Sequence, residues 1–591
     1  MCSIIIQLVM IIAWGAQLMS SDAYYVNYTM LFAIVCLCVY KNFKAGDFSI
    51  CKRHGKYENV ILYLFAALFS TMVAASNYKI YAFRNVPADF GMPFPLIYRS
   101  LLTVIFFLGG FFAFEHVFNV IVSGIKKMCW NPCEKTYTPR QVFIISFAIL
   151  VFTRWLVLHF CQYPGELTPD SISQMEQLLT NVYSNHHPFY HTMVIKAFIN
   201  LGMKLFGDIN AAVATYSCFQ ILFTAMCFSF AVSTMAMMKA PKWIMITSML
   251  FYIMMPYHII YAITMWKDIM FGCFILLLVI FTYRCLCFPG KRVFDYVMLT
   301  ISSFGTCLFR SNGFFAFVIL TIAFLALWKL RHKKIVVVFI SAVVISFVMK
   351  HAVLAGLGVT QPDTIESLSI PAQQIARVIV GGEELEDWQK DLLEKVIDIE
   401  KIPESYKPFI SDPIKNLVRD KGNQQYISEH KGEFIKLYIS LGLKNPLAYV
   451  YAWIDQTRGY WNAGYSYWRW FLGVLDNDLG IERTTRSVVL DTMLREYLWM
   501  FEDMQVLRIF LSIGLFVWID IVMLMIGLLR KDKASLFAAL PVLVVVASLL
   551  VATPVHSEFR YIYAVFCALP MVMVIALRPE VKREDSLSSR S

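Results

Sequence analysis

The strongest constraint in this sequence is a series of apolar stretches, each about twenty residues long, separated by short polar loops. An α-helix of that length crosses the roughly 30 Å hydrocarbon core of a bilayer. The stretches do not alternate polar and apolar residues as the strands of an outer-membrane barrel do. The sequence therefore predicts an all-α polytopic membrane protein. About 14 membrane-spanning helices are expected, at 3–20, 26–41, 58–75, 98–123, 142–161, 211–238, 243–262, 266–288, 294–312, 313–330, 334–353, 506–529, 534–552 and 560–577.

The composition supports the same class and excludes others. Of the 591 residues, 58% are hydrophobic and 16% are charged, whereas soluble domains carry about 25% charged residues. So few charges cannot cover a soluble surface, and a disordered chain would be richer in charge and poorer in apolar residues. The formal net charge is +11, but the basic residues gather in short loops, as the positive-inside rule describes. We therefore exclude nucleic acid as a partner.

The basic loops also set the expected orientation. All of them reach the cytoplasm if the segment 188–206 does not cross the membrane. In that segment Thr192, Lys196, Asn200 and Lys204 recur every four positions and share one helical face, which predicts an amphipathic helix in the outer interface. Both termini are then cytoplasmic, in a multi-pass protein of the plasma membrane. The basic loop residues are Lys41, Lys44, Lys52, Arg53, Lys56, Lys126, Lys127, Lys135, Arg140, Lys239, Lys242, Arg284, Lys291, Arg292, Lys329, Arg331, Lys333, Lys334, Arg530, Lys531, Lys533, Arg578, Lys582 and Arg583.

This orientation divides the chain into five parts. They are N-terminal spans (1–161), a first large outer loop with the interfacial helix (162–210), central spans (211–353), an extracytoplasmic domain (354–505, here called the outer domain) and C-terminal spans with a cytoplasmic tail (506–591).

The outer domain is expected to be mostly helical. The stretches 386–400 and 430–444 have helical periodicity, and no cysteine lies between Cys307 and Cys567, so no disulfide framework is expected there. Aromatic residues crowd the stretch 449–470. Such rings either stack on sugars or form an aromatic belt at the membrane surface, and the belt is slightly favoured.

The first outer loop contains a candidate catalytic carboxylate, Asp170, directly after Pro169. One interpretation is that Asp170 caps the helix that follows it. The other is that its carboxylate, held at the membrane surface, accepts a proton from a hydroxyl nucleophile. The two roles do not exclude each other.

Histidines near this loop raise the question of a metal. His186 and His187 precede the interfacial helix and are either ordinary interface residues or ligands of phosphate or of a metal. His187 and His191, four residues apart, would make half of a metal site, but the sequence shows no other half. Cys129 and Cys133 likewise lack a second pair. We therefore expect no cofactor, and a divalent metal is not favoured.

Further charged residues lie at the ends of later predicted spans. Lys267 and Asp268 begin one of them, where a local helix-start arrangement beside Trp266 is the alternative to a functional role. Arg310 is close to bilayer depth, where a charge needs a partner and is a functional candidate. The expected orientation brings all these groups and the turn 556–560 to the outer side, where cations and carboxylates suit a lipid-linked phosphate. The residues of that turn concerned are His556, Glu558 and Arg560.

Short motifs in these loops carry a resemblance to a known family. YPG (163–165), DS (170–171), Gln174 and HHP (186–188) resemble the YPG…DS…HP signature of a bacterial membrane family. Its later motifs are similar to WKD (266–268), RSNG (310–313), SIPAQQIARV (369–378) and SEFRY (557–561). The architecture is similar to that of the GT-C superfamily of integral-membrane glycosyltransferases, and the resemblance covers most of the chain.

The resemblance implies a transferase that moves a sugar from a polyprenyl-phosphate donor to a cell-envelope glycan hydroxyl on the outer face, with inversion. Asp170 matches the acidic loop residue and would be the general base. No second acidic residue stands beside it, so a metal-dependent version is not favoured. A lipid-linked oligosaccharide flippase or transporter, and a polysaccharide polymerase or ligase with a diphosphate donor, remain alternatives. The donor phosphate would be held by Lys267, Arg310, Arg560 and His187, and the sugar or acceptor supported by Asp268, His186, Glu558, His556 and Gln374.

Overall fold

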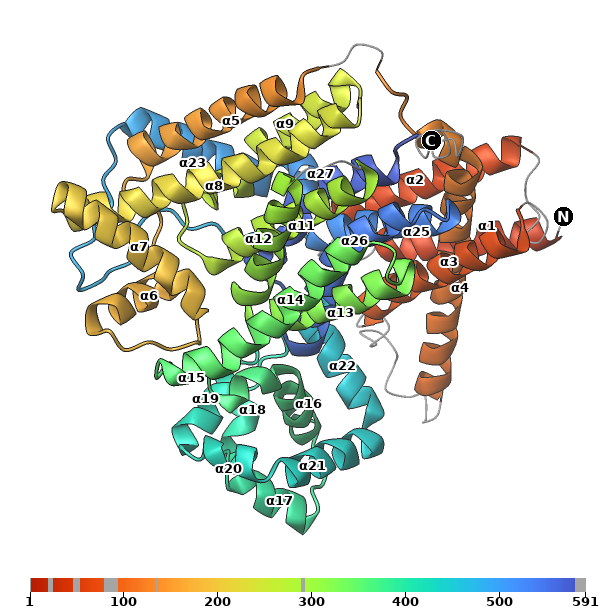
Figure 1. Cartoon of the computed structure of the whole chain (residues 1–591). Coiled ribbons are helices and arrows are strands. Elements are labelled where there is room, and N and C mark those ends of the chain that lie inside the picture. Colours follow the sequence, from red (N-terminus) through yellow and green to blue (C-terminus); the bar gives the residue numbers. More distant parts are fainter. Residues whose placement is uncertain are drawn as a thin grey trace.

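The computed structural model describes residues 2–19, 25–45, 54–78, 94–133, 137–288 and 293–579 (Figure 1). Within these ranges every regular element is a helix, and extended segments pair only through isolated bridges. The all-α prediction is therefore confirmed. Seven basic residues used to orient the chain lie outside the described residues: Lys52, Arg53, Lys135, Lys291, Arg292, Lys582 and Arg583.

In the described part of the chain, nine helices are long and apolar enough to cross a membrane, which makes the protein multi-pass. A tenth span forms if the segment Gln505–Leu511 and the helix α25 (Ile513–Leu529), which meet at 61°, act together. The remaining predicted segments are helices outside this set: α1 (Cys2–Met19), α2 (Tyr25–Lys44), α9 (Lys242–Met254) and α12 (Val293–Leu308). The nine are α3 (Lys56–Ser76), the Leu101–Ile125 part of α4 (Phe94–Met128), Pro139–Cys161 with α5 (Pro139–Leu156), α8 (Ile209–Met237), α11 (Lys267–Cys287), α13 (Ser311–Trp328), Lys333–Gly356 with α14 (Lys333–Val348), α26 (Lys533–Ala552) and Phe559–Ala576 with α27.

One predicted span is broken. The segment 243–262 was expected as one helix, but α9 ends at Met254 and a new helix, α10 (Pro256–Ile260), begins at the proline. Proline has no N–H, so the carbonyl of Tyr252 loses its intrahelical donor. The fully buried Arg154 of α5 donates to that carbonyl at 2.5 Å. The break directs the chain into the loop 261–266, which supports the candidate site.

The most enclosed spans, α11 and α27 (Tyr563–Ala576), pack against each other in the centre of the molecule (Figure 1). Gly272 makes their close approach possible, because a Cβ atom there would lie 3.0 Å from the ring of Tyr563 and 3.2 Å from the backbone nitrogen of Ala564. Lys267 and Asp268 begin α11, and Arg560 lies in the turn before α27. The central packing therefore fixes the segments that carry the candidate site.

The predicted interfacial segment forms a separate helix, α7 (Phe189–Phe206), which is not among the candidate spans. One side packs against α8. Thr192 is buried and accepts a hydrogen bond from Gln174, whereas Lys196 bonds to Tyr183 nearer the surface. The expected polar face is therefore divided between the interior and the surface, and its place in the outer interface stays a prediction.

The outer domain has its own apolar core. Its helices, from α16 (Ser369–Val380) to α22 (Pro446–Thr457), lie together at one end of the molecule (Figure 1). The predicted helix at 430–444 is confirmed as α21 (Lys431–Lys444), whereas the one at 386–400 ends early as α17 (Asp387–Glu394), followed by short turns. The other helices used below are α16 (Ser369–Val380), α19 (Asp412–Lys421), α20 (Gln424–Glu429) and α22 (Pro446–Thr457).

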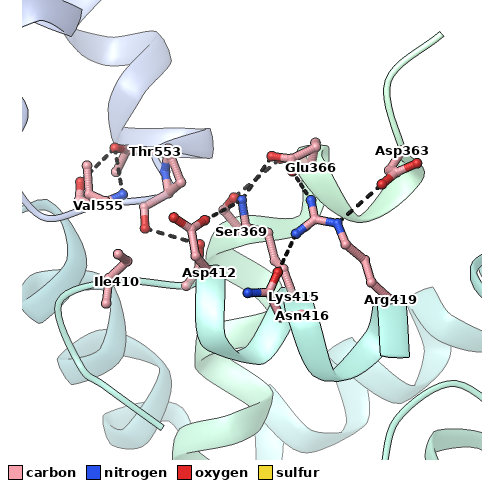
Figure 2. A network of polar contacts seen from close by, with 12 residues as sticks. Asp363, Glu366, Ser369, Ile410, Asp412, Lys415, Asn416, Arg419, Thr553 and Val555 are labelled. Carbon is pink, nitrogen blue, oxygen red and sulfur yellow. Dashed lines mark hydrogen bonds and ion pairs between the residues drawn. The ribbon is translucent and has the colours of Figure 1, made fainter. Parts of the chain in front are cut away.

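Backbone contacts join the outer domain to the turn that precedes α27. The backbone N–H of Ser411 donates to the carbonyl of Pro554 at 2.8 Å, and that of His556 donates to the carbonyl of Phe409 at 2.8 Å. Figure 2 shows Ile410 beside Val555 at this junction.

In the aromatic stretch, Tyr460, Trp461 and Trp468 are buried, so these rings form neither a sugar platform nor a surface belt.

Candidate active site around Asp170

The loop before Asp170 is held by backbone hydrogen bonds to the loop before α11. The N–H of Glu166 donates to the carbonyl of Ile263 at 2.9 Å, and the N–H of Met265 donates to the carbonyl of Glu166 at 3.1 Å. Gly165 has φ of +130°, and a Cβ atom there would lie 2.2 Å from Ser217 Oγ. Only glycine fits this position, so the YPG motif is explained by backbone geometry.

Asp170 is the second residue of α6 (Pro169–Thr180), and it does not cap the helix. The capping interpretation is wrong because Pro169 already occupies the first helical position and Thr168 is the N-cap. The backbone N–H of Thr168 donates to Ser171 Oγ at 3.2 Å, which completes the cap from the other side. The carboxylate of Asp170 is therefore left for contacts with other side chains.

Three groups from distant segments surround this carboxylate. Arg560 Nη1 donates to Asp170 Oδ2 at 2.7 Å, and Lys267 Nζ lies 3.6 Å from the same oxygen. Burial alone would raise the pKa of Asp170, but Arg560 and Lys267 outweigh it and hold the pKa well below its usual value. The carboxylate is thus firmly ionised, and it remains about a quarter exposed, with a side-chain accessibility of 23%.

His187 is the third of these groups, and it is neutral. Lys267 Nζ donates to its Nδ1 at 2.9 Å, so this nitrogen must be an acceptor. Burial, together with the positive charge of Lys267, lowers the pKa of His187 to about 3. The 3.8 Å contact between His187 Nδ1 and Asp170 is therefore not an ion pair at neutral pH.

A second ion pair lies next to the first. Arg310 Nη1 is 2.8 Å from Asp268 Oδ1 and donates to the carbonyl of Tyr561 at 3.0 Å. The guanidinium groups of Arg310 and Arg560 both contact the ring of Tyr561, with their central carbons 4.8 and 5.2 Å from its centroid. This ring links Arg310 to the Asp170 cluster and holds both arginines through cation–π contacts.

Arg560 has a further aromatic neighbour and a second carboxylate nearby. Its guanidinium lies 4.8 Å above the ring of Trp266, whose Nε1 donates to Thr168 Oγ1 at 2.5 Å. Glu558 Oε1 is 3.9 Å from Arg560 Nε. Burial raises the pKa of Glu558 more than Arg560 lowers it. The sequence missed the roles of Trp266 and Tyr561 around Arg560, although both belong to the quoted motifs.

A chain of buried hydrogen bonds supports α6 and α7 from below. The side chain of Gln174 donates to Thr192 and bonds His191 Nδ1 at 3.1 Å, and His191 Nε2 lies 2.9 Å from the hydroxyl of Tyr216. Both ring nitrogens of His191 are therefore occupied, so His187 and His191 do not form half of a metal site. No group of three or more His, Cys, Asp or Glu side chains suited to a metal ion occurs in the ranges that the structure describes.

Three predicted site residues do not join the cluster. His186 is exposed, and its ring packs nearly perpendicular to that of His187, with the centroids 4.8 Å apart. His556 bonds the hydroxyl of Tyr465 at 3.0 Å. Gln374 lies in the outer domain, where it donates to the carbonyl of Tyr449 and accepts from Tyr438. The remaining predicted residues, Lys267, Asp268, Arg310, Glu558, Arg560 and His187, lie together around Asp170, and their roles stay predictions.

Comparison with known proteins identifies a family for this chain. The family described as "Family of unknown function (DUF6020)" matches residues 178–590, which is more than half of the chain. The matched region begins after Asp170 and includes His187, Lys267 and Arg560. No curated protein and no solved structure matches the chain.

Proposed function

We propose that this chain, which belongs to the DUF6020 family, is a membrane glycosyltransferase similar to the GT-C superfamily. It has about 14 spans, lies in the plasma membrane with both termini in the cytoplasm, and transfers a sugar from a polyprenyl-phosphate donor to a cell-envelope hydroxyl. The observation that carries the proposal is the ionised carboxylate of Asp170, 2.7 Å from Arg560 and 3.6 Å from Lys267. Distant parts of the chain supply these three groups.

The reaction is a single displacement. The acceptor hydroxyl oxygen attacks the anomeric carbon and forms the new C–O bond, while the bond from that carbon to the phosphate oxygen breaks. Asp170 takes the hydroxyl proton, and the polyprenyl phosphate leaves with the bonding electrons. Arg560 and Lys267 stabilise the charge on that phosphate. Attack from the side opposite the phosphate inverts the anomeric centre.

The cations also control the strength of the base. In the free site the pKa of Asp170 is held far below neutrality, so Asp170 is a weak base. A donor phosphate competes with Asp170 for Arg560 and Lys267, and this raises the pKa of the carboxylate. Asp170 therefore becomes an effective base only when the donor is bound.

Other groups of the cluster act by position. The guanidinium of Arg310 is already engaged by Asp268 and by the Tyr561 carbonyl, so we assign it to holding the Tyr561 ring against Arg560. His187, neutral and bonded to Lys267, orients the ammonium group. Glu558, whose pKa is raised, is the group that we assign to a hydroxyl of the sugar or acceptor.

The test supplies purified protein with polyprenyl-phosphate hexoses labelled in the sugar and with envelope glycan as acceptor. Wild type is expected to transfer label and Asp170→Asn is not. Asp208→Asn is the matched control, because Asp208 caps α8 elsewhere on the surface and asparagine also caps helices. Full transfer by a folded Asp170→Asn variant would overturn the base assignment, and no transfer by wild type would overturn the reaction class.

A lipid-linked oligosaccharide flippase is the second candidate, and one buried carboxylate favours it. Asp520 in α25 is fully buried, and neither of its oxygens has a hydrogen-bond partner among the described residues. Ionisable groups at bilayer depth commonly mark transport paths. Transport of a fluorescent lipid-linked sugar in vesicles tests this candidate: Asp520→Asn should abolish transport if it is correct and should leave glycosyl transfer intact if it is not.

A further inference from the structure

The core of the outer domain contains a cavity of about 400 Å³. Its walls are formed mainly by aliphatic side chains of α16, α19 and α21 and of the turns between them. An engineered apolar cavity of roughly 150 Å³ already binds benzene and stays dry. Natural cores contain few voids larger than a water molecule. The principal lining residues are Ile365, Ile375, Ala376, Ile397, Ile414 and Phe434.

One end of the cavity is bounded by exposed residues of α21. Lys431 and Ile435 both line the cavity, and Ile435 is 58% exposed. Ile439 and Leu443 continue from Ile435 at intervals of four residues and are 52% and 79% exposed. These three side chains form an apolar stripe on one face of α21, and Lys431 and Lys444 stand at the ends of that helix. An apolar helical face flanked by lysines is suited to the surface of an anionic bilayer.

An ion-pair network fixes one wall of the cavity. Glu366 belongs to η4 (Thr364–Leu368), whose Ile365 and Leu368 line the cavity. Figure 2 shows Glu366 meeting Lys415 and Arg419 of α19. Lys415 Nζ is 2.9 Å from Glu366 and 2.7 Å from Asp412, and the lysine is only 2% exposed. The network ties η4 to α19, so this wall is not free to close the space.

We infer that this cavity binds one hydrocarbon chain of an anionic membrane lipid. The chain enters beside Ile435, the α21 stripe rests on the bilayer surface, and Lys431 contacts the phosphate of the head group. Because the protein is anchored in the membrane, such lipids surround it at high local concentration. The inference does not depend on the transferase proposal, because none of the lining residues belongs to the Asp170 cluster.

The experiment uses the full chain reconstituted in lipid vesicles. One preparation contains phosphatidylglycerol with a photoactivatable diazirine at the end of an acyl chain, and the other contains a polyprenyl phosphate with the same group on its chain. After illumination, adducts are located by mass spectrometry. Labelling of cavity-lining positions such as Ile375 and Ile397 is expected in at least one preparation, and the preparation that labels identifies the source of the chain.

Two substitutions fill the cavity. Ala376 is buried on α16 and Ala372 is half-buried one helical turn before it, and both line the space. Ala376→Phe, or Ala372→Phe if the first variant fails to fold, should lose the adducts in the cavity. Ala448→Phe is the matched control, because Ala448 packs against the same core without lining the cavity. Asp170→Asn should keep the adducts, so failure of the transferase proposal and failure of this one are distinguishable.

Two results would overturn the inference. The first is labelling of the membrane spans or the α21 stripe in both preparations with no adduct at the cavity-lining positions. The second is cavity labelling that is equal in wild type and in a folded cavity-filling variant. Lys431→Glu adds a check on the head group, since it should weaken labelling by the phosphatidylglycerol probe but not by an uncharged diacylglycerol probe.

Discussion

Two carboxylates in this protein each meet two cations, but they do so in different ways. Glu366 contacts Lys415 and Arg419, which both belong to α19 and lie about fifty residues away along the chain (Figure 2). Asp170 contacts Arg560 and Lys267, which are 390 and about a hundred residues away along the chain. Coulomb attraction acts in the same way in the Glu366 and Asp170 clusters, so it does not explain how they differ.

The difference lies in what the rest of the structure does for each group. The Glu366 network joins neighbouring segments, and Asp363 and Asp412 share its cations, so its charges satisfy one another. The Asp170 cluster is assembled by packing of α11 and α27, and closing such long loops costs entropy. Its arginine, Arg560, contacts the rings of Trp266 and Tyr561, and its carboxylate remains partly exposed. We therefore expect substitutions in the first group to change stability and those in the second to change activity.

The largest effect is expected for Asp170→Asn. Loss of the proton acceptor should lower the rate of sugar transfer by about 10²–10⁴-fold. Loss of the ion pairs with Arg560 and Lys267 should also lower the unfolding temperature, because these pairs stabilise the folded state. The rate is measured with the labelled donors described above and the unfolding temperature by thermal scanning. A variant that unfolds at much lower temperature while the surviving folded protein transfers sugar normally would make Asp170 a structural residue like Glu366.

Arg560→Lys should have the next largest effect. Lysine keeps the positive charge but loses the planar contact with Trp266 and Tyr561 and the fixed donor geometry. We expect kcat/KM for the donor to fall by about 10²–10³-fold, as for the loss of one positioned donor to a developing anion. Arg419→Lys in the outer domain is the control and should transfer sugar normally. Equal activity of both variants would contradict the contrast between the two clusters.

Glu366→Gln tests whether the Glu366 network contributes to stability rather than to activity. It leaves the buried Lys415 with one carboxylate fewer, and hydrogen bonds to charged groups are worth about 1.5–3 kcal/mol. Because Glu366 is 25% exposed, we expect the free energy of unfolding of the outer domain to fall by about 1–2 kcal/mol. Hydrogen exchange of peptides from η4 and α19 measures this change. Lost transfer activity with unchanged exchange would show that Glu366 serves a site.

Acid should destabilise the protein partly through His187. Its pKa is about 3 in the folded chain and about 6.5 when unfolded. Between these pH values the unfolded state binds a proton at His187 that the folded state does not bind. The contribution of His187 to the free energy of unfolding is therefore fully present above about pH 6.5 and is lost as the pH drops toward 3. His187→Asn should reduce that slope by at most about 1.4 kcal/mol per pH unit.

The pH effect is measured as the unfolding midpoint between about pH 7 and pH 5. His191 and His556, whose pKa values are lowered to about 3 and about 4, act in the same range and contribute to the slope that remains. Burial is the main cause of both shifts. Identical slopes in wild type and His187→Asn would mean that His187 has the same pKa in the folded and the unfolded protein, which would contradict the shift caused by its burial.

The smallest effect is expected for Gln374→Ala. Gln374 belongs to a motif of the resemblance, but its contacts are Tyr438 and Tyr449 in the outer domain. Loss of these hydrogen bonds should lower the free energy of unfolding by about 0.5–1.5 kcal/mol and leave transfer unchanged. A loss of transfer without a loss of stability would return Gln374 to the active site.

Much of the fold could be predicted because bilayer thickness fixes the length of a span. The long apolar run of α11 identifies it as a membrane span without any knowledge of the tertiary structure. The basic loops then set the expected orientation of the segments. The break before Pro256 was visible as a proline inside an apolar run, but its carbonyl partner, Arg154, lies on another helix. The structure does not test whether shorter apolar helices such as α12 also cross the bilayer, so the count of about 14 spans stays a prediction.

The candidate site was predicted in part because orientation brings several polar turns to one side. That argument groups Asp170, Lys267 and Arg560, but it contains no distances. It could not show that Pro169 leaves capping to Thr168, nor that the ring of Tyr561 contacts two arginines, since both depend on local geometry. Gln374 was assigned to the site because it belongs to a motif, but a motif can mark the core of a domain as well as a site.

The most direct test is an experimentally determined structure of the protein with a polyprenyl-phosphate sugar bound in nanodiscs. The account predicts that the phosphate contacts Arg560 and Lys267 and that the anomeric carbon faces the carboxylate of Asp170. It also predicts that Arg560 has moved away from Asp170 toward the phosphate. A phosphate bound elsewhere, with the contact between Arg560 and Asp170 intact, would contradict the central claim that these residues form a donor-phosphate site.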